Sequence, residues 1–105
     1  MTSIVHVQFS AFTAYIGRNP RHGDTRWGNP FRLDVNASRT ETYLVVRSFA
    51  KWLRTRDALL AEIPSLRGEI LGCHCRRPDR LDWPCHGQVL AAWADQGIGT
   101  DWTSR

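Results

Sequence analysis

The feature that most constrains the fold of this chain is a segment that holds all three of its cysteines and two of its four histidines. It begins with Gly-Cys-His-Cys at residues 72–75 and closes with Pro-Cys-His-Gly at residues 84–87. Residues 69–71 before it predict a strand, and residues 88–93 after it predict a helix. A strand that leads through a polar loop into a helix N-terminus is a common frame for a ligand site. The segment therefore indicates an α/β fold with its site between strand and helix.

Two more strands are expected near the N-terminus, at residues 4–9 and 13–16. The few residues between them suit a hairpin or a simple bend. His6 lies in the first of these strands, and we expect it to be half-exposed and to belong to no site, because no neighbouring residue completes one.

Three helices are predicted, at about residues 39–55, 57–63 and 86–95, and the first and the last carry apolar residues at helical spacing. Local capping signals mark where these helices begin and end. They are a capping box of Ser38 with Glu41, a cap at Asp57, and a stop at Gly97.

The order of these elements predicts one small α/β domain over residues 1–105, with a short, mostly parallel, Rossmann-like sheet and flanking helices. A strand that returns to its sheet through helices is normally parallel to its neighbour. The C-terminal ends of the strands at 13–16 and 69–73 should therefore share one edge. Gly17 and Arg18 would then lie beside Cys73.

A long irregular segment between residues 17 and 36 contains the run Arg-Trp-Gly-Asn-Pro-Phe at residues 26–31. Irregular loops of this length in a small domain are usually functional. Trp27 and Phe31 are expected to anchor the loop in the core, and the anchored loop can present Arg26 and Asn29 to a ligand.

The cysteine segment has a metal-site interpretation. Cys73, Cys75, Cys85 and His86 offer three thiolates and an imidazole, which suffice for tetrahedral zinc, with His74 as a substitute fourth ligand. On an extended strand, Cys73 and Cys75 project to one side and His74 to the other. An iron–sulfur cluster on three cysteines is the less favoured cofactor.

The same residues also suit a metal-free site, and the sequence leaves both interpretations open. Cys85 at a helix N-terminus would be a reactive thiolate with His86 as its base, which makes these two the catalytic candidates. Whether any reaction is catalysed is undecided, and the cysteines could also be packing residues. The candidates for ligand binding are Arg18, Arg26, Trp27, Gly28, Asn29, Arg76 and Gly87.

The charge supports an anionic partner. The formal net charge is +4, and 13 of the 14 basic residues are arginine, whose planar fork matches phosphate. A genome rich in arginine codons would give the same total, so the clustering of arginines in the two loops is more informative. No apolar run suits a membrane span and no secretory signal is visible, so we expect a cytoplasmic protein with reduced thiols.

The motifs together resemble a known family. Tyr-Ile-Gly-Arg at 15–18, the 26–31 run, and the cysteine motifs at 71–75 and 84–87 are similar to those of an uncharacterised bacterial and phage family, domain of unknown function 4326. The resemblance extends from about Tyr15 to Ala94. It implies a fold of this kind and carries over no activity.

Two functions follow from these features as expectations. The favoured one is a pocket at the C-terminal edge of the sheet that binds a phosphate-bearing small molecule, most plausibly a nucleotide, with or without a metal ion. The alternative is a metal-stapled basic module that binds nucleic acid and stacks bases on Trp27 or Trp83.

Overall fold

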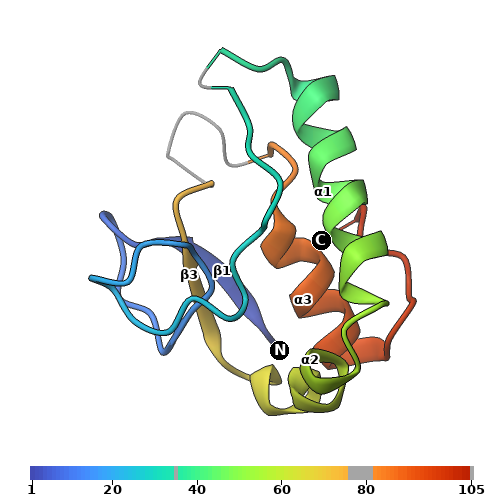
Figure 1. Ribbon diagram of the computed structural model, residues 1–105. Coiled ribbons are helices and arrows are strands. Elements are labelled where there is room, and N and C mark those ends of the chain that lie inside the picture. Colours follow the sequence, from blue (N-terminus) through green and yellow to red (C-terminus); the bar gives the residue numbers. More distant parts are fainter. Residues whose placement is uncertain (35, 76–81, 105) are drawn as a thin grey trace.

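The computed structural model of this chain describes residues 1–34, 36–75 and 82–104 (Figure 1). Within these ranges, three strands, three α-helices and one 3-10 turn make up a small α/β domain. They are β1 (Ser3–His6), β2 (Ala14–Tyr15), α1 (Arg39–Leu53), α2 (Asp57–Glu62), η1 (Ile63–Leu66), β3 (Ile70–Cys73) and α3 (His86–Gln96).

The sheet has the order β1-β3-β2, and both outer strands run parallel to β3. His6 pairs with Cys73, and Tyr15 pairs with Gly72. The amide of Ile16 donates to the carbonyl of Gly72 at 2.9 Å, which continues the pairing one residue further. The predicted parallel sheet with a shared C-terminal edge is confirmed. A hairpin between the first two strands is wrong, because β3 separates them and all three strands point the same way.

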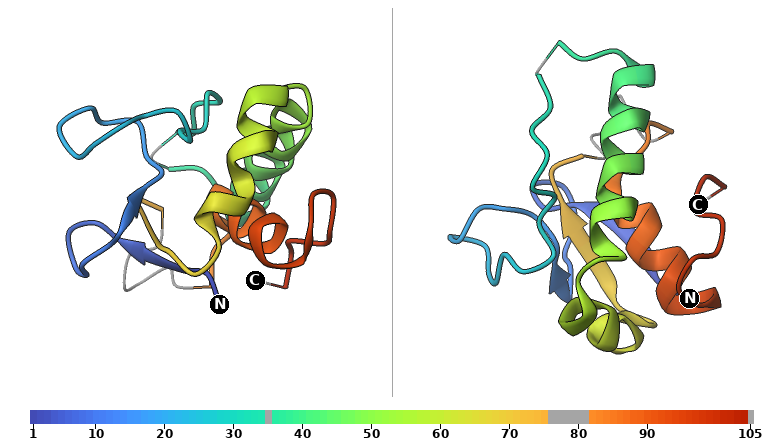
Figure 2. Two further views of the ribbon diagram at one scale, coloured as in Figure 1. Left: turned by 90° about the horizontal axis from the view of Figure 1, so that it is seen from below. Right: turned by 45° about the vertical axis from the view of Figure 1, so that its right-hand side comes forward.

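The helices lie on one side of the sheet (Figures 1 and 2). Helix α3 packs on β1 and β3, and α1 packs on α3. Because the views show helices on one side only, the Rossmann-like part of the prediction is not confirmed. Within the residues that the structure describes, no helix is long and apolar enough to cross a membrane.

Helix α3 is the centre of the core, with every residue from His86 to Ala94 buried. Its first turn approaches the sheet very closely at Gly87. A Cβ atom there would meet Ile16 Cδ1 at 3.0 Å and Ile4 Cγ2 at 3.2 Å. A larger residue would push the helix away, so Gly87 brings the start of α3 against the C-terminal edge of the sheet.

Local signals set most helix ends. Ser38 and Glu41 form the predicted capping box on α1. Gly97 ends α3 as predicted, because its φ of 108° is not helical. Its amide makes the last helical hydrogen bond, to the carbonyl of Trp93. Asp57 does not cap α2: it is the first helical residue, and the cap position belongs to Arg56, which makes no side-chain capping bond.

Candidate metal centre and adjoining cavity

Three thiols meet at the C-terminal edge of the sheet. Cys73 ends β3, Cys75 follows two residues later, and Cys85 is the N-cap of α3. The three Sγ atoms lie within 4.8 Å of one another, and Cys73 and Cys85 are 3.3 Å apart. Cys73 and Cys85 are fully buried, whereas Cys75 is partly exposed. The structure thus joins two motifs that are separated by eight residues of chain.

The thiols share their protons unequally. Hydrogen bonds from Cys75 and Cys85 lower the pKa of Cys73 well below its usual range. The same contacts with Cys73 raise the pKa of Cys75 and Cys85, because each holds its proton against the neighbouring sulfur. Three thiols this close together are groups that a soft cation can bind as it displaces their protons.

His86 stands next to this cluster with its ring fixed. Its Nε2 atom lies 2.6 Å from the carbonyl oxygen of Ile16. A carbonyl oxygen only accepts, so Nε2 carries the proton and a neutral ring has its lone pair on Nδ1. Nδ1 faces Cys75 Sγ at 3.6 Å, and the ring of Phe49 packs edge-on at 5.1 Å between centroids.

These atoms suit a soft divalent cation. Sulfur ligands of tetrahedral zinc lie about 2.3 Å from the ion and therefore about 3.8 Å from one another. The 3.3 Å between Cys73 Sγ and Cys85 Sγ is about half an ångström shorter than that spacing, and the 3.6 Å from His86 Nδ1 to Cys75 Sγ is close to it. His86 approaches the cluster from the Cys75 side, so a fourth bond from Nδ1 would enter there. Metal-bound histidines generally donate their second ring nitrogen to a carbonyl or carboxylate, as His86 does here.

A cavity of about 710 Å³ opens beside the thiols, between the loop after β2, the start of α1 and the start of α3. Four of the predicted site residues line it: Arg18, Asn29, Cys75 and His86. Its wall also holds apolar side chains of α1, including Val45 and Val46. The cavity therefore joins an apolar wall to a basic, polar rim, with Cys75 and His86 at its boundary with the thiol cluster.

The other predicted ligand residues lie elsewhere. Trp27 is buried in the core with 6% of its surface exposed, and Gly87 packs against the sheet. Arg76 lies outside the described residues.

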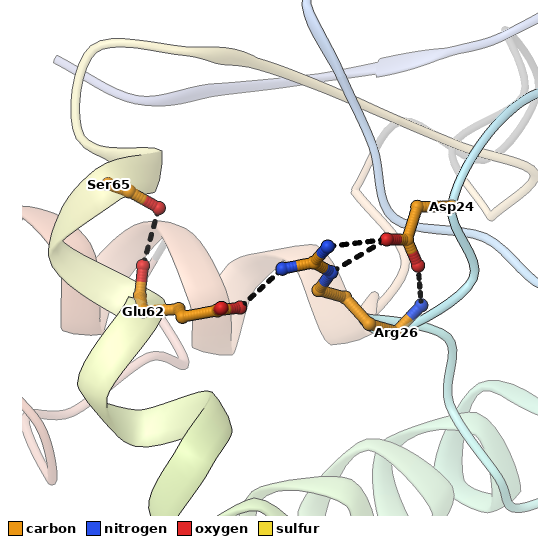
Figure 3. A network of polar contacts seen from close by, with 4 residues as sticks. All are labelled: Asp24, Arg26, Glu62 and Ser65. Atoms are coloured by element: carbon orange, nitrogen blue, oxygen red, sulfur yellow. Dashed lines mark hydrogen bonds and ion pairs between the residues drawn. The ribbon is translucent and has the colours of Figure 1, made fainter.

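The Arg26 guanidinium is engaged outside the cavity (Figure 3). It donates to Asp24 Oδ2 and, at 2.7 Å, to Glu62 Oε2 at the end of α2. The hydroxyl of Ser65 donates to the backbone carbonyl of Glu62 beside it. Arg26 thus ties the long loop to α2, and nothing in this arrangement points it toward a ligand.

Gly28 has a steric role in the loop. A Cβ atom at Gly28 would lie 2.6 Å from Arg18 Cγ and 3.0 Å from the carbonyl oxygen of Gly17. The absence of a side chain therefore leaves the space in which the stem of Arg18 lies. The two loop motifs around Gly17 and Gly28 meet at this contact.

Several cavity residues were not predicted from the sequence. They are isolated polar or aromatic residues whose positions become informative only when the loop is folded. Among them are Asn19, Arg32 and Thr42.

His6 is buried, with 5% of its surface exposed, so the expectation of a half-exposed residue is wrong. Its ring lies 5.0 Å from that of Phe9 and 5.6 Å from that of His74, and His22 packs on His74 at 5.4 Å. Partial burial, His6 and His22 together lower the pKa of His74. The chain turns sharply after His6, where the amides of Phe9 and Ser10 donate to its carbonyl, so β1 stops earlier than predicted.

The sequence of this chain was compared with family models and with known proteins, and the matches include the family that its motifs resemble. Residues 5–96 match the model of a family described as a domain of unknown function, DUF4326. An uncharacterised 12.4 kDa protein from the nrdA-td intergenic region of Enterobacteria phage T4 is 30% identical over 70 residues, or 67% of this chain. An uncharacterised protein of Acanthamoeba polyphaga mimivirus is 32% identical over 84 residues, or 72% of this chain.

The chain spans 60% and 62% of the lengths of these two viral relatives. No solved structure matches it. The family model covers nearly the whole sheet, the long loop and the thiol cluster. This chain therefore belongs to the family of domain of unknown function 4326.

Proposed function

We propose that this domain binds a zinc ion through Cys73, Cys75 and Cys85, with Nδ1 of His86 as the fourth ligand. The observation that carries the proposal is the convergence of three Sγ atoms within 4.8 Å at the end of β3 and the start of α3. Thiolate and imidazole ligands favour zinc over hard cations such as magnesium or calcium. In the cytoplasm, where thiols stay reduced, such a cluster would stay available to metal. An iron–sulfur cluster on the same three sulfurs is the less favoured occupant.

We further propose that the adjoining cavity binds a phosphate-bearing small molecule, with a nucleotide as the favoured ligand. The cavity lies at the carboxyl ends of parallel strands, where α/β proteins usually bind ligands. Arg18 and Arg32 on its rim supply positive charge, and Trp83 and the apolar wall of α1 supply a surface for a flat ring.

The metal-free alternative, with Cys85 as a nucleophile, has less support. Cys85 is fully buried, and contacts with Cys73 and Cys75 raise the pKa of its thiol. A nucleophilic thiol needs both access to its substrate and a lowered pKa. We therefore assign Cys85 to the metal centre and leave the domain without an assigned reaction.

A nucleic-acid module also has less support than a small-molecule site. Trp27 is in the core and cannot stack on a base from outside. Trp83 borders the cavity, so a base stacked on it would lie in the cavity. The rim arginines suit a phosphate in either kind of ligand, so the concave shape is what favours the small molecule.

The metal proposal is tested by elemental analysis of the purified protein. We expect about one zinc per chain in the wild type. The change Cys85→Ser should weaken zinc binding by at least about a hundredfold. This exceeds the loss usually caused by mutating a residue that only hydrogen-bonds to a metal ligand. Gln96→Ala, an exposed change at the far end of the same helix, serves as the control. A zinc-free wild type with three titratable thiols, or an unchanged zinc Kd in Cys85→Ser, would contradict the proposal.

The ligand proposal is tested by calorimetric titration of the zinc-loaded protein with the four nucleoside monophosphates. We expect at least one to bind with a Kd below about 1 mM, an affinity of about 4 kcal/mol. The matching nucleosides, which lack phosphate, should bind more weakly. Equal binding of nucleosides, or no binding of any nucleotide, would rule out a phosphate-reading cavity.

A further inference from the structure

A continuous chain of contacts leads from the thiol cluster to the cavity rim. Cys75 Sγ faces Nδ1 of His86 at 3.6 Å, and Nε2 of His86 bonds the carbonyl of Ile16 at 2.6 Å. Gly17 and Arg18 follow Ile16 directly, and both line the cavity. The backbone that carries Arg18 is thus tied to the metal ligands through one imidazole ring.

Two further contacts fix the start of the loop around Arg18. Gly28 leaves the space that the Arg18 stem occupies. The amide of Asn19, the next residue, donates to the hydroxyl of Tyr15 at 2.8 Å. Because the backbone is held on both sides of Arg18, the positions that its guanidinium can reach are restricted. A binding group that is already positioned loses less conformational entropy when it binds a ligand.

The guanidinium of Arg18 is free to take an anion. Within the described part of the chain, Arg26 and Arg39 form ion pairs with carboxylates, whereas Arg18 forms none. Arg18 is exposed at the rim of the cavity. A charged donor whose backbone is held beside a cavity suits a phosphate group.

We infer that the metal centre positions Arg18 through His86, so that recognition of a phosphate group in the cavity depends on the bound metal. The inference rests on the proposed function, since it needs both a metal at the thiols and a phosphate in the cavity. With metal bound, Cys75 and His86 are held together and Ile16 is held with them. Without metal, the thiols are free to rearrange and His86 loses one of its two partners.

The coupling must act in both directions, because linked binding equilibria are reciprocal. Phosphate bound at Arg18 should therefore tighten the binding of zinc by the same factor by which zinc tightens the binding of phosphate. Reciprocity holds whatever the structural route of the coupling, so the route through His86 is tested by the variants at Gly28 and His86.

The first arm of the test uses inorganic phosphate as the probe. Its binding is followed by NMR shifts of the amides of residues 17–19, in zinc-loaded protein and in protein stripped by a chelator. We expect the zinc-loaded protein to bind phosphate about five- to tenfold more tightly, within the usual range of coupling between two sites. Zinc affinity measured with and without phosphate should change by the same factor.

The second arm uses variants measured in the zinc-loaded form. Arg18→Ala should weaken phosphate binding about ten- to hundredfold, the usual cost of losing a charged hydrogen bond. Gly28→Ala should also weaken it at least about fivefold with the zinc content unchanged, because the new methyl group displaces the Arg18 stem. Arg47→Ala removes an equal charge from an exposed site on α1 outside the cavity, and should leave phosphate binding unchanged.

A third arm separates the two bonds of His86. In His86→Gln the amide can still donate to the Ile16 carbonyl, but it offers no imidazole nitrogen to the metal. We expect this variant, at saturating zinc, to bind phosphate no more tightly than its zinc-free form does.

Three results would overturn the inference. The first is phosphate binding that is equal with and without zinc, and the second is wild-type phosphate binding in both Arg18→Ala and Gly28→Ala. The third is zinc-dependent phosphate binding that Arg18→Ala does not affect, because phosphate would then bind the metal itself. If the stripped protein unfolds, the Gly28→Ala arm still decides the role of Arg18. Failure of zinc to bind at all, or of phosphate to bind the zinc-loaded wild type, would instead contradict the proposed function.

Discussion

Zinc added to chelator-stripped protein is expected to raise its Tm by about 15 to 30 °C at a free zinc concentration a thousand times the Kd. Ligand at that excess stabilises the native state by about 4 kcal/mol, and each kcal/mol shifts the Tm of a domain of this size by about 4 to 8 °C. The physical reason is that the thiol cluster joins the end of β3 to the first turn of α3. The unfolded chain does not hold these sulfurs together, so the energy of metal binding adds to the energy of folding.

Differential scanning calorimetry over a series of zinc concentrations gives the measurement. Cys73→Ser is the informative companion variant, because Cys73 accepts hydrogen bonds from both other thiols. Its Tm should respond little to zinc, and magnesium should have no effect on either protein. A wild-type Tm that is independent of zinc would show that the sulfurs are a packed cluster and not a metal centre.

Phe49→Ala is expected to destabilise the protein by about 3 to 5 kcal/mol, the usual cost of emptying a large aromatic site in a core. Phe49 is fully buried on the inner face of α1, and its ring packs edge-on against His86. Because that contact is one of those that hold the imidazole, the same change should also weaken zinc binding. The free energy of unfolding is measured by urea titration of the zinc-free protein, so that metal binding does not enter the comparison.

Leu44→Ala on the same helix is the matched control. Leu44 is 49% exposed, so its truncation removes little buried surface and should cost well under 1 kcal/mol. Equal destabilisation by the two changes would mean that α1 does not pack as described. Undiminished zinc affinity in Phe49→Ala would mean that the aromatic contact does not position His86.

Most features that depend on neighbouring residues were predicted correctly from the sequence, and the cap at Asp57 is the exception. The capping box at Ser38 uses groups three residues apart, and the stop at Gly97 depends on one backbone conformation. The parallel pairing of β2 with β3 follows from the helices that connect them. The capping box and the stop at Gly97 each depend on a few consecutive residues, so short-range rules predict them.

The predictions that failed or stayed incomplete depend on which distant groups meet. Whether His6 is buried depends on Phe9 and on His74, which arrives from the end of β3. The guanidinium of Arg26 lies on Glu62, 36 residues away, although the sequence suggested that it faces a ligand. No local pattern specifies such a choice, because several carboxylates are within reach of a flexible arginine before the loop is packed.

The sequence by itself determined that three thiols and two imidazoles lie between a strand and a helix, and that the second and third strands are parallel. Only the tertiary structure decided that His86 turns its Nε2 atom to the Ile16 carbonyl and leaves Nδ1 for Cys75. It also decided that Gly28 lies against the stem of Arg18. The physical reason is that a strand or a helix forms from contacts within a few residues, whereas the orientation of a side chain at a site is set by whichever neighbours the whole packed chain brings against it.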